Sequence, residues 1–599
     1  MNNTPSSSAF TIDRLVSRLA ASWLLFTLGA LATGGNFGDI SYLRQLPVWA
    51  AALIIAALFA ALSAASSKVK IHLDSWALAV GGTGSCFVWL MRYPNSSQRI
   101  YFAIGCIVVL CLIFAYFRHA NRGLLDKLRL IAANKDRLAL VWTAICGIVM
   151  FSSISIVTVL RYKSFAAPNF DFGLFVNMFH NMAESGLPMV TSERDMLLSH
   201  FAVHISPIYY LMLPAYLLFR SPVTLQLCQA AVVALGIIPV HLLSRRLGLS
   251  PWQKMLVSAI YAFYPALSTS CFYDLHENCF LPVCLLSMFL CYETKKYPLM
   301  YLFAALTLMV KEDAAVYILI FAVFIMLSEK SFFHGAVLAV TAVGYFAVCI
   351  ALLNGFGMGA MSWRYENLIY GESGGLFGVI STAILNPGYV LSQSVTTSDG
   401  GAQKLLYLIQ MLLPVGFLPF ASKKASRWLL AAPVLINLLT MYGYQYDLGF
   451  QYHFGAAAFF VYAMIKNIPQ IKPDIRAGAL WLAVISCFCL YTTFVTREAA
   501  FRLSAYRSGR ENFIAAEEFL DTIPEDSSVC ASSMLVAHLA DRDEIYELES
   551  HGNEPDVDFV VIDLRYENQS YIDAYTACGY TLYAEHENMI KVLKAPEQA

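Results

Sequence analysis

Long apolar runs separated by short polar stretches make up most of this chain. A helix needs about 20 apolar residues to cross a bilayer, and runs that approach this length recur between residues 16 and 496. By hydropathy, the candidate spans are residues 16–34, 47–66, 74–91, 100–117, 138–160, 223–243, 254–270, 278–293, 297–310, 314–328, 334–353, 404–421, 427–442, 450–466 and 477–496. The pattern therefore predicts an α-helical polytopic membrane protein with about 15 transmembrane helices.

Lysine and arginine in the short loops predict the orientation of these helices, because such residues accumulate on the cytoplasmic side. The loop at 118–137 is the most basic, and it shares one side with the clusters at 245–254 and 466–476 only if residues 205–219 do not cross. That run is short and contains Pro207 and Pro214, so a re-entrant or interfacial helix is expected there. If it crossed, the cluster at 245–254 would face outward. The non-crossing threading predicts a cytoplasmic N-terminus and an extracytoplasmic C-terminus.

Composition agrees with a membrane protein and excludes other classes. Hydrophobic residues make up 58% of the chain and charged residues 14%, and the mean hydropathy is +0.59. A net charge of −1 offers no basic surface to nucleic acid. The 14 cysteines are scattered and form no CxxC pair, so we interpret most of them as small apolar core residues.

The composition changes to charged and polar after residue 496. Residues 510–523 have the pattern of an amphipathic helix, and 558–564 that of a buried strand. We expect a small extracytoplasmic α/β domain, either for substrate recognition, as a lid, or as a structural cap; Cys530 and Cys578 could pair in it. The predicted division is 1–160 for the N-terminal transmembrane helices, 161–222 for an outer loop, 223–496 for the transmembrane core and 497–599 for the α/β domain.

The outer loop 161–222 contains the first group of candidate functional residues. Asp171 precedes apolar residues at mixed three- and four-residue steps, which predicts an amphipathic helix on the membrane surface with Asp171 near its start. Asp171 could equally be a helix N-cap, and the two roles are compatible. His200 and His204 are four residues apart, which suits metal binding on one helix face; a pair bonded to backbone is the alternative.

Further polar residues interrupt apolar runs on the same predicted face. Ionisable residues at such depth are costly and usually face a cavity or one another, although Lys311 and its neighbours could also form a solvated turn. Carboxylates, imidazoles and a lysine together can hold a divalent cation and a phosphate and can move a proton. The polar residues that interrupt the apolar runs are Asp274, His276, Glu277, Lys311, Glu312, Asp313 and His453.

Several motifs resemble a family of predicted bacterial membrane proteins, domain of unknown function 2079. They are NFDFGLFVNMFHNMAESGLP, SHFAVHISPIYYLMLPAYLLF, LGIIPVHLLSRRLG, KEDAA, QYHF and IPEDSSVCASSMLVAHLADRDEIYEL. The resemblance covers residues 150–565. The family more distantly resembles the GT-C class of membrane glycosyltransferases, in which an Asp at the start of the first outer loop acts as base or metal ligand. His-Ile-Ser-Pro stands here where that class has His-Pro-Pro, and no second acidic residue directly follows Asp171.

The resemblance implies a GT-C-like fold in a bacterial plasma membrane and a transfer of sugar from a polyprenyl-phosphate donor to a cell-envelope glycan or protein. It implies Asp171 as the catalytic residue. Lys311, His204, His276 and His453 would bind substrate or phosphate. A divalent cation, Mg or Mn, would take its ligands from a set of candidates comprising Asp171, His200, Asp274, Glu277, Glu312 and Asp313.

Two other function classes remain open from the sequence. A transporter or flippase of an envelope lipid or polar solute would use intramembrane charges to line a path. A non-catalytic envelope assembly protein would keep the scaffold without the chemistry. No paired, broken helices in symmetric halves are found, which argues against the transporter.

Overall fold

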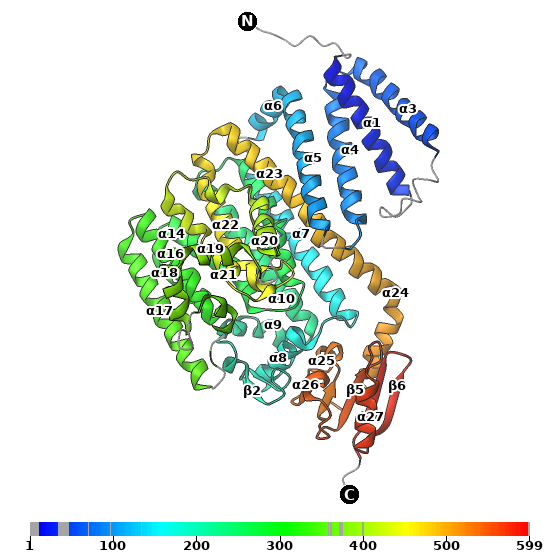
Figure 1. The fold of residues 1–599 in the computed structure, drawn as a ribbon, viewed down its shortest axis with the longest axis vertical. Coiled ribbons are helices and arrows are strands. Elements are labelled where there is room, and N and C mark those ends of the chain that lie inside the picture. Colours follow the sequence, from blue (N-terminus) through cyan, green and yellow to red (C-terminus); the bar gives the residue numbers. More distant parts are fainter. Residues whose placement is uncertain are drawn as a thin grey trace.

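A computed structural model describes residues 11–33, 47–69, 71–95, 98–132, 135–356, 359, 362–369, 375–397 and 401–596. Helices form most of the described chain, and a strand-rich C-terminal region lies below them in Figure 1. The N-terminal helices lie beside a larger group of packed helices (Figure 1). Helix α1 begins at the upper end of the molecule and the last strands lie at its lower end.

Most of the N-terminal helices share a core of their own, but the last of them, Asp136–Lys163, packs into the core of the central helices. The N-terminal helices are α1 (Ile12–Thr33), α3 (Val48–Lys68), α4 (Leu73–Arg92), α5 (Arg99–Ala120), α6 (Arg122–Ala132) and α7 (Asp136–Lys163). Arg18 on α1 and Asp74 on α4 are both fully buried, with Arg18 Nε 2.7 Å from Asp74 Oδ1. The pair joins the two helices, because an unpaired charge between them would be costly.

The central helices are mostly short and packed among themselves. They are α10 (Pro222–Leu235), α11 (Ile237–Arg246), α12 (Pro251–Ala262), α13 (Pro265–Ser268), α14 (Leu281–Glu293), α15 (Tyr297–Leu308), α16 (Ala315–Ser328), α17 (Phe332–Gly355), α18 (Gly375–Leu385), α19 (Pro387–Val395), α20 (Gln403–Leu412), α21 (Val434–Leu438), α22 (Phe454–Asn467) and α23 (Pro473–Tyr491). Every residue of α22 is buried, so protein rather than lipid surrounds it and its length need not match the bilayer.

Six helical stretches of the described residues are long and apolar enough to cross a membrane. They are Val48–Lys68, Arg99–Ala120, Asp136–Lys163, Pro222–Arg246, Phe332–Gly355 and Pro473–Leu520. The count of about 15 spans stays a prediction, since the central helices are shorter than this criterion requires. Within residues 205–219 the chain forms only short turns and the six-residue helix α9 (Leu213–Leu218). Neither is long enough to cross a bilayer.

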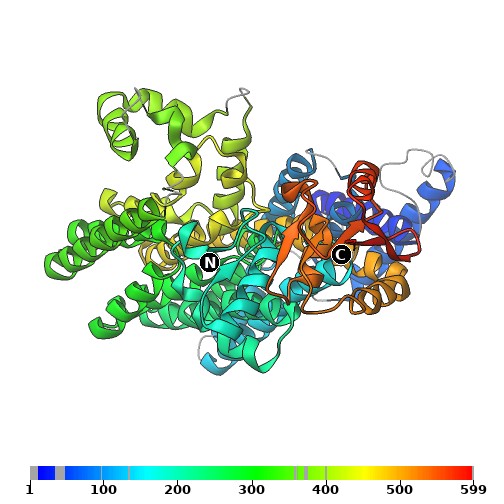
Figure 2. The same ribbon diagram turned by 90° about the horizontal axis from the view of Figure 1, so that it is seen from below.

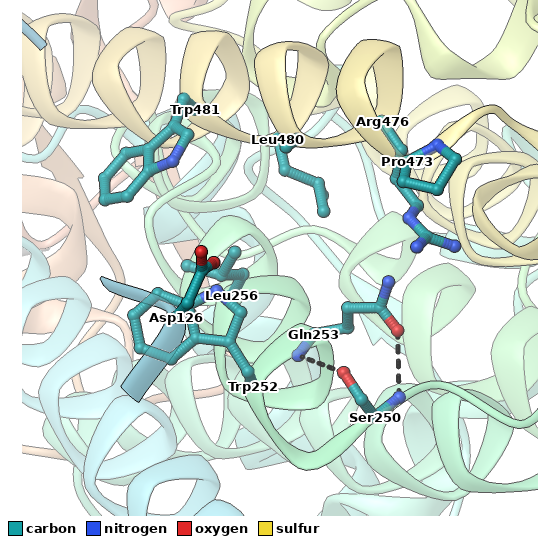
Figure 3. Close-up of a pocket in the computed structure, with 10 residues that line it drawn as sticks. Asp126, Ser250, Trp252, Gln253, Leu256, Pro473, Arg476, Leu480 and Trp481 are labelled. Atoms are coloured by element: carbon teal, nitrogen blue, oxygen red, sulfur yellow. Dashed lines mark hydrogen bonds between the residues drawn. The ribbon is translucent and has the colours of Figure 1, made fainter. Parts of the chain in front are cut away.

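The predicted basic loops meet at one end of the molecule. Lys254 Nζ lies 2.5 Å from Asp136 Oδ1, and Lys466 Nζ lies 2.6 Å from Glu293 Oε1. A cavity of about 500 Å³ lies at this end between α6, α12 and α23, and Figure 3 shows the residues that line it. Trp252 and Trp481 line it, and indole rings are typical of membrane–water boundaries.

The segment after α7 packs at the opposite end. It comprises the irregular turn η1 (Asn169–Gly173), α8 (Leu174–Ser185), β1 (Met189–Val190), β2 (Leu198–Ser199), the turn η2 (His200–Ala202) and α9. The prediction that α8 lies on the membrane surface differs from the structure. Seven of its residues, the polar Asn177 among them, are buried. The reason is that Asn177 on the polar face donates to the carbonyls of Ala540 and Arg542 in the C-terminal region. In Figure 2 the orange C-terminal segments lie beside the cyan ones.

The C-terminal region (residues 521–596) is reached without a loop. Helix α23 continues through the turn η14 (Thr492–Thr496) into α24 (Arg497–Leu520), a helical run of 48 residues. The region contains β3 (Val529–Ala531), α25 (Ser533–Leu539), β4 (Ile545–Glu547), α26 (Leu548–His551), β5 (Phe559–Asp563), α27 (Gln569–Ala577), β6 (Thr581–His586) and β7 (Ile590–Lys594). The sheet order is β4-β3-β5-β7-β6, parallel across β4, β3 and β5. Cys530 is buried and Cys578 exposed, and both are free thiols.

Candidate functional site

A cavity of about 310 Å³ collects polar side chains from segments far apart in the sequence. We call it the polar cavity. Its charged and imidazole residues come from the segment 169–204 after α7, the loops after α13 and α15, and the loop after α17. They are Asp171, Glu193, Arg194, His200, His204, His276, Lys311 and Arg364, with Phe170, Leu174, Phe175, Val203, Tyr273, Tyr442, Tyr444, Phe450, Gln451 and Tyr452 completing the wall.

Asp171 lies in η1, where the chain turns into α8. Helix α8 has no side-chain cap, so the N-cap interpretation does not hold. Among the described residues, no side chain or backbone group makes a hydrogen bond to the Asp171 carboxylate. Burial, aided by the nearby Glu277, raises the pKa of Asp171 to about 7 although Lys311 opposes it. A carboxylate in this state can accept a proton near neutral pH.

His200 forms a buried dyad with Glu193. Its Nδ1 lies 2.9 Å from Glu193 Oε2, and its Nε2 is buried without a partner among the described residues. Burial lowers the pKa of His200, but the Glu193 carboxylate outweighs this and the net pKa lies above the ordinary value. The dyad therefore presents a fixed imidazole edge to the polar cavity.

His204 forms a second dyad, with Glu312. The distance from His204 Nδ1 to Glu312 Oε1 is 3.0 Å, and the other Glu312 oxygen accepts the backbone N–H of Ile205 at 3.2 Å. The rings of His200 and His204 lie 6.1 Å apart and each binds a different carboxylate. The two histidines share the cavity wall, but each Nδ1 is already engaged.

Glu277 and Lys311 form a fully buried ion pair behind His276. Lys311 Nζ lies 3.2 Å from Glu277 Oε1, while Tyr209 donates its hydroxyl to Glu277 Oε2 at 2.8 Å. Although burial favours the neutral carboxyl, His276 and Lys311 lower the pKa of Glu277 below its usual range. Glu277 is therefore an ionised anchor that keeps the Lys311 ammonium at the cavity wall.

Five predicted residues do not line the polar cavity. Glu277 and Glu312 are the partners of the wall residues Lys311 and His204. Asp274 pairs with Arg161 at 3.0 Å, and burial raises the pKa of Asp274 to about 8 although Arg161 opposes it. His453 is buried, with Nδ1 3.1 Å from the Tyr407 hydroxyl and Nε2 bonded to the Asp447 carbonyl. Asp313 is exposed and lines the neighbouring apolar cavity described next.

A second, mostly apolar cavity of about 420 Å³ adjoins the first. Its apolar wall comes from α16, α17, α18 and α21 and the segments beside α21: Val316, Tyr317, Ile320, Phe346, Ile350, Tyr365, Val379, Ala432, Leu435, Ile436 and Leu439. His204, Lys311 and Arg364 line both cavities. The two cavities thus meet at a pair of cationic side chains.

The described residues contain no group of three or more His, Cys, Asp and Glu side chains arranged to hold a metal ion. The carboxylates named above are instead bonded to histidine, lysine or arginine, apart from Asp171 and the exposed Asp313. The divalent-cation site therefore stays a prediction.

The family profile of a predicted membrane protein, DUF2079, matches residues 161–590. The chain belongs to this family. The DUF2079 match begins in the last turn of α7 and includes every residue of both cavities, whereas α1, α3, α4, α5 and α6 lie outside it.

Comparison with solved structures finds ArnT from Cupriavidus metallidurans bound to undecaprenyl phosphate. It is 10% identical, with a TM-score of 0.46 over 78% of the DUF2079 chain and 100% of ArnT. The apo state of the same protein is 9% identical, with a TM-score of 0.39 over 77% and 99% of the two chains. No curated protein sequence matches the chain.

Three charged residues of this DUF2079 site were not predicted from the sequence: Glu193, Arg194 and Arg364. All three lie in long polar loops, where a charge gives no hydropathy signal. The Arg364 guanidinium carbon lies 4.7 Å from the ring centre of Tyr442 and 5.4 Å from that of Tyr452. Aromatic clusters such as WRYEN and YGYQYDLGFQY were the only available signal, since arginine often stacks on such rings.

Proposed function

We propose that the chain is a membrane glycosyltransferase that moves a sugar from a polyprenyl-phosphate donor to a cell-envelope acceptor at the outer face of the membrane. One observation carries the proposal: the polar cavity with the Asp171 carboxylate adjoins an apolar cavity, and Lys311 and Arg364 line both. The GT-C resemblance of the sequence motifs points to the same reaction class.

The paired cavities suit a donor that is itself half polar and half apolar. The isoprenoid tail would lie against Ile320 and Ile436 in the apolar cavity, and its phosphate would lie at the cationic junction. Lysine and arginine are the usual partners of phosphate oxygens. The sugar would then enter the polar cavity, where Tyr442 and Tyr452 offer aromatic faces.

The reaction would be a single displacement with inversion at the anomeric carbon. Asp171 takes the proton of the acceptor hydroxyl as its oxygen forms a bond to the anomeric carbon. The bond from that carbon to the phosphate oxygen breaks, and polyprenyl phosphate leaves with the electron pair. Lys311 and Arg364 stabilise the charge that develops on the leaving phosphate. No step is assigned to a metal ion, because no three-ligand group supports one among the described residues.

The deciding experiment compares envelope glycans and glycoproteins by mass spectrometry in cells with and without the chain. Loss of one sugar mass on a defined component is expected when the chain is absent. Asp171→Asn should fail to restore it, with a rate lower by about 10²- to 10⁴-fold, while the protein still inserts and folds. Asp447→Asn is the matched control, because Asp447 is an exposed carboxylate outside the polar cavity.

Full activity of Asp171→Asn would remove Asp171 from the mechanism. Unchanged envelope masses, together with counterflow of a lipid or solute in vesicles and no covalent product, would favour a transporter instead.

A further inference from the structure

The backbone around Asp171 is held by the C-terminal region, more than 350 residues away in the sequence. The Asn169 N–H donates to Ser533 Oγ at 3.2 Å, and Arg565 Nη2 donates to the Phe165 carbonyl at 2.8 Å. A Cβ on Gly173 would lie 2.9 Å from Val536 Cγ1, so only glycine permits this close approach. Contacts from α25 therefore fall two residues before and two residues after Asp171.

The segment that carries Glu193 is held by the same region. Thr191 Oγ1 donates to the Ile545 carbonyl at 2.6 Å and accepts the Ile545 N–H at 3.1 Å, which covers the edge of β4. His551 Nδ1 lies 2.8 Å from Asp195 Oδ1. Both acidic residues of the polar cavity thus lie on segments anchored to the C-terminal sheet.

Ser533 is itself oriented for its contact with η1. Its hydroxyl donates to Glu547 Oε1 at 2.6 Å, and its own N–H donates to Glu549 Oε2 at 3.0 Å. With its proton committed to Glu547, the hydroxyl oxygen is left to accept the Asn169 N–H. None of the residues that line the polar cavity belongs to the C-terminal region, so Ser533 acts through the backbone of η1.

We propose that Ser533 is a positioning residue that sets where the Asp171 carboxylate lies in the polar cavity. This role deepens the proposed glycosyl transfer and rests on it for its effect on turnover. It assigns the C-terminal region to the construction of the site, in place of a separate recognition domain or lid. A misplacement of about 1 Å at a reacting group can cost about 10²-fold in rate.

The test uses the full-length protein in detergent or nanodiscs with three variants. Ser533→Ala removes the acceptor of the Asn169 N–H, and Ser533→Thr keeps a hydroxyl there. Ser528→Ala is the matched control, because the Ser528 hydroxyl bonds only to Asp558 within the C-terminal region. The readouts are hydrogen exchange of residues 166–175, stabilisation by undecaprenyl phosphate, and the KM and kcat of sugar transfer.

Ser533→Ala should speed exchange at the Asn169 amide by about fivefold, the equivalent of one lost hydrogen bond. It should lower kcat by about tenfold or more and leave both the KM for the lipid donor and the stabilisation by undecaprenyl phosphate unchanged. Ser533→Thr should restore both exchange and kcat, and Ser528→Ala should change neither.

Exchange at 166–175 that is the same in Ser533→Ala and Ser528→Ala would overturn the proposal, as would wild-type kcat in a variant with faster exchange. If the wild-type chain transfers no sugar, the proposed function fails separately. The exchange result alone then decides whether Ser533 positions Asp171.

Discussion

Asp171 and Lys311 both line the polar cavity, but only Lys311 has a bonded partner of opposite charge. The Lys311 ammonium forms an ion pair with the buried Glu277 carboxylate, with Nζ 3.2 Å from Oε1. In contrast, no described residue hydrogen-bonds to the Asp171 carboxylate. An unbonded carboxylate in a partly enclosed site lowers the stability of the folded state, and such costs are typical of residues retained for chemistry. The residues around Asp171 therefore favour a proton acceptor over a structural carboxylate.

The raised pKa of Asp171 predicts a pH dependence of transfer. Below pH 7 the carboxyl is protonated and cannot accept the hydroxyl proton, so kcat should rise about tenfold per unit toward pH 7 and then level off. Ionising a group whose pKa is raised on folding costs stability above its unfolded pKa. Asp171→Asn should therefore raise Tm by a few degrees at pH 8 and not at pH 4. A flat rate profile from pH 5.5 to 8.5 would contradict the base role.

Arg364→Ala is predicted to weaken binding of undecaprenyl phosphate by about tenfold or more. The reason is that hydrogen bonds between a guanidinium and a phosphate are stronger than hydrogen bonds between neutral groups. Binding can be measured by thermal shift or microscale titration. Arg476→Ala is a matched control, because Arg476 lines the cavity at the other end of the molecule (Figure 3). Equal loss in both variants would indicate a non-specific attraction to anionic lipid.

At the scale of elements, the apolar cavity between α16, α17, α18 and α21 decides which ligands fit. Ile320→Trp should fill part of it and lower the affinity for undecaprenyl phosphate, while inorganic phosphate, which has no tail, should be unaffected. Leu327→Trp on the same helix is the control, since Leu327 is 53% exposed and lies outside the cavity. Unchanged lipid affinity in Ile320→Trp would place the tail elsewhere.

Sequence patterns predicted helices well where burial alone decides them. Helices α7 and α17 lie close to the predicted spans because lipid and protein interior both require apolar side chains. The surroundings of α8 were not predictable, because an amphipathic pattern does not say what covers the polar face. The cover is α25, which follows more than 340 residues later. His200 was found by its four-residue spacing from His204, and Lys311 because it interrupts an apolar run. Arg364 was missed because neither signal marks it.

At the scale of the whole molecule, the polar cavity and the basic loops lie at opposite ends. Ion pairs such as Lys254–Asp136 gather the predicted cytoplasmic loops at one end, and Asp171, Lys311 and Arg364 meet at the other. This arrangement agrees with the charge pattern of the loops, which by itself predicts the compartments but not the contacts.

Cys578 provides a native test of the predicted orientation. It is the only exposed cysteine of the 14, all of which lie in the described part of the chain. A membrane-impermeant maleimide should label it from the outer side of the plasma membrane in cells whose outer layers admit the reagent. Cys578→Ser should abolish the signal. Labelling only after lysis would place the C-terminal region, and with it the polar cavity, in the cytoplasm.

The continuous helical run from Pro473 to Leu520 limits how substrates of the proposed glycosyltransferase could reach the polar cavity. At 1.5 Å per residue the run is about 70 Å long, and it connects the apolar helices to the C-terminal sheet as one helical element. The C-terminal sheet follows this run directly and is also hydrogen-bonded to the turn beside Asp171. We therefore expect it to stay in place during the proposed reaction. A lipid-borne reactant would instead arrive sideways out of the surrounding leaflet, and its long tail would never need to leave the hydrocarbon.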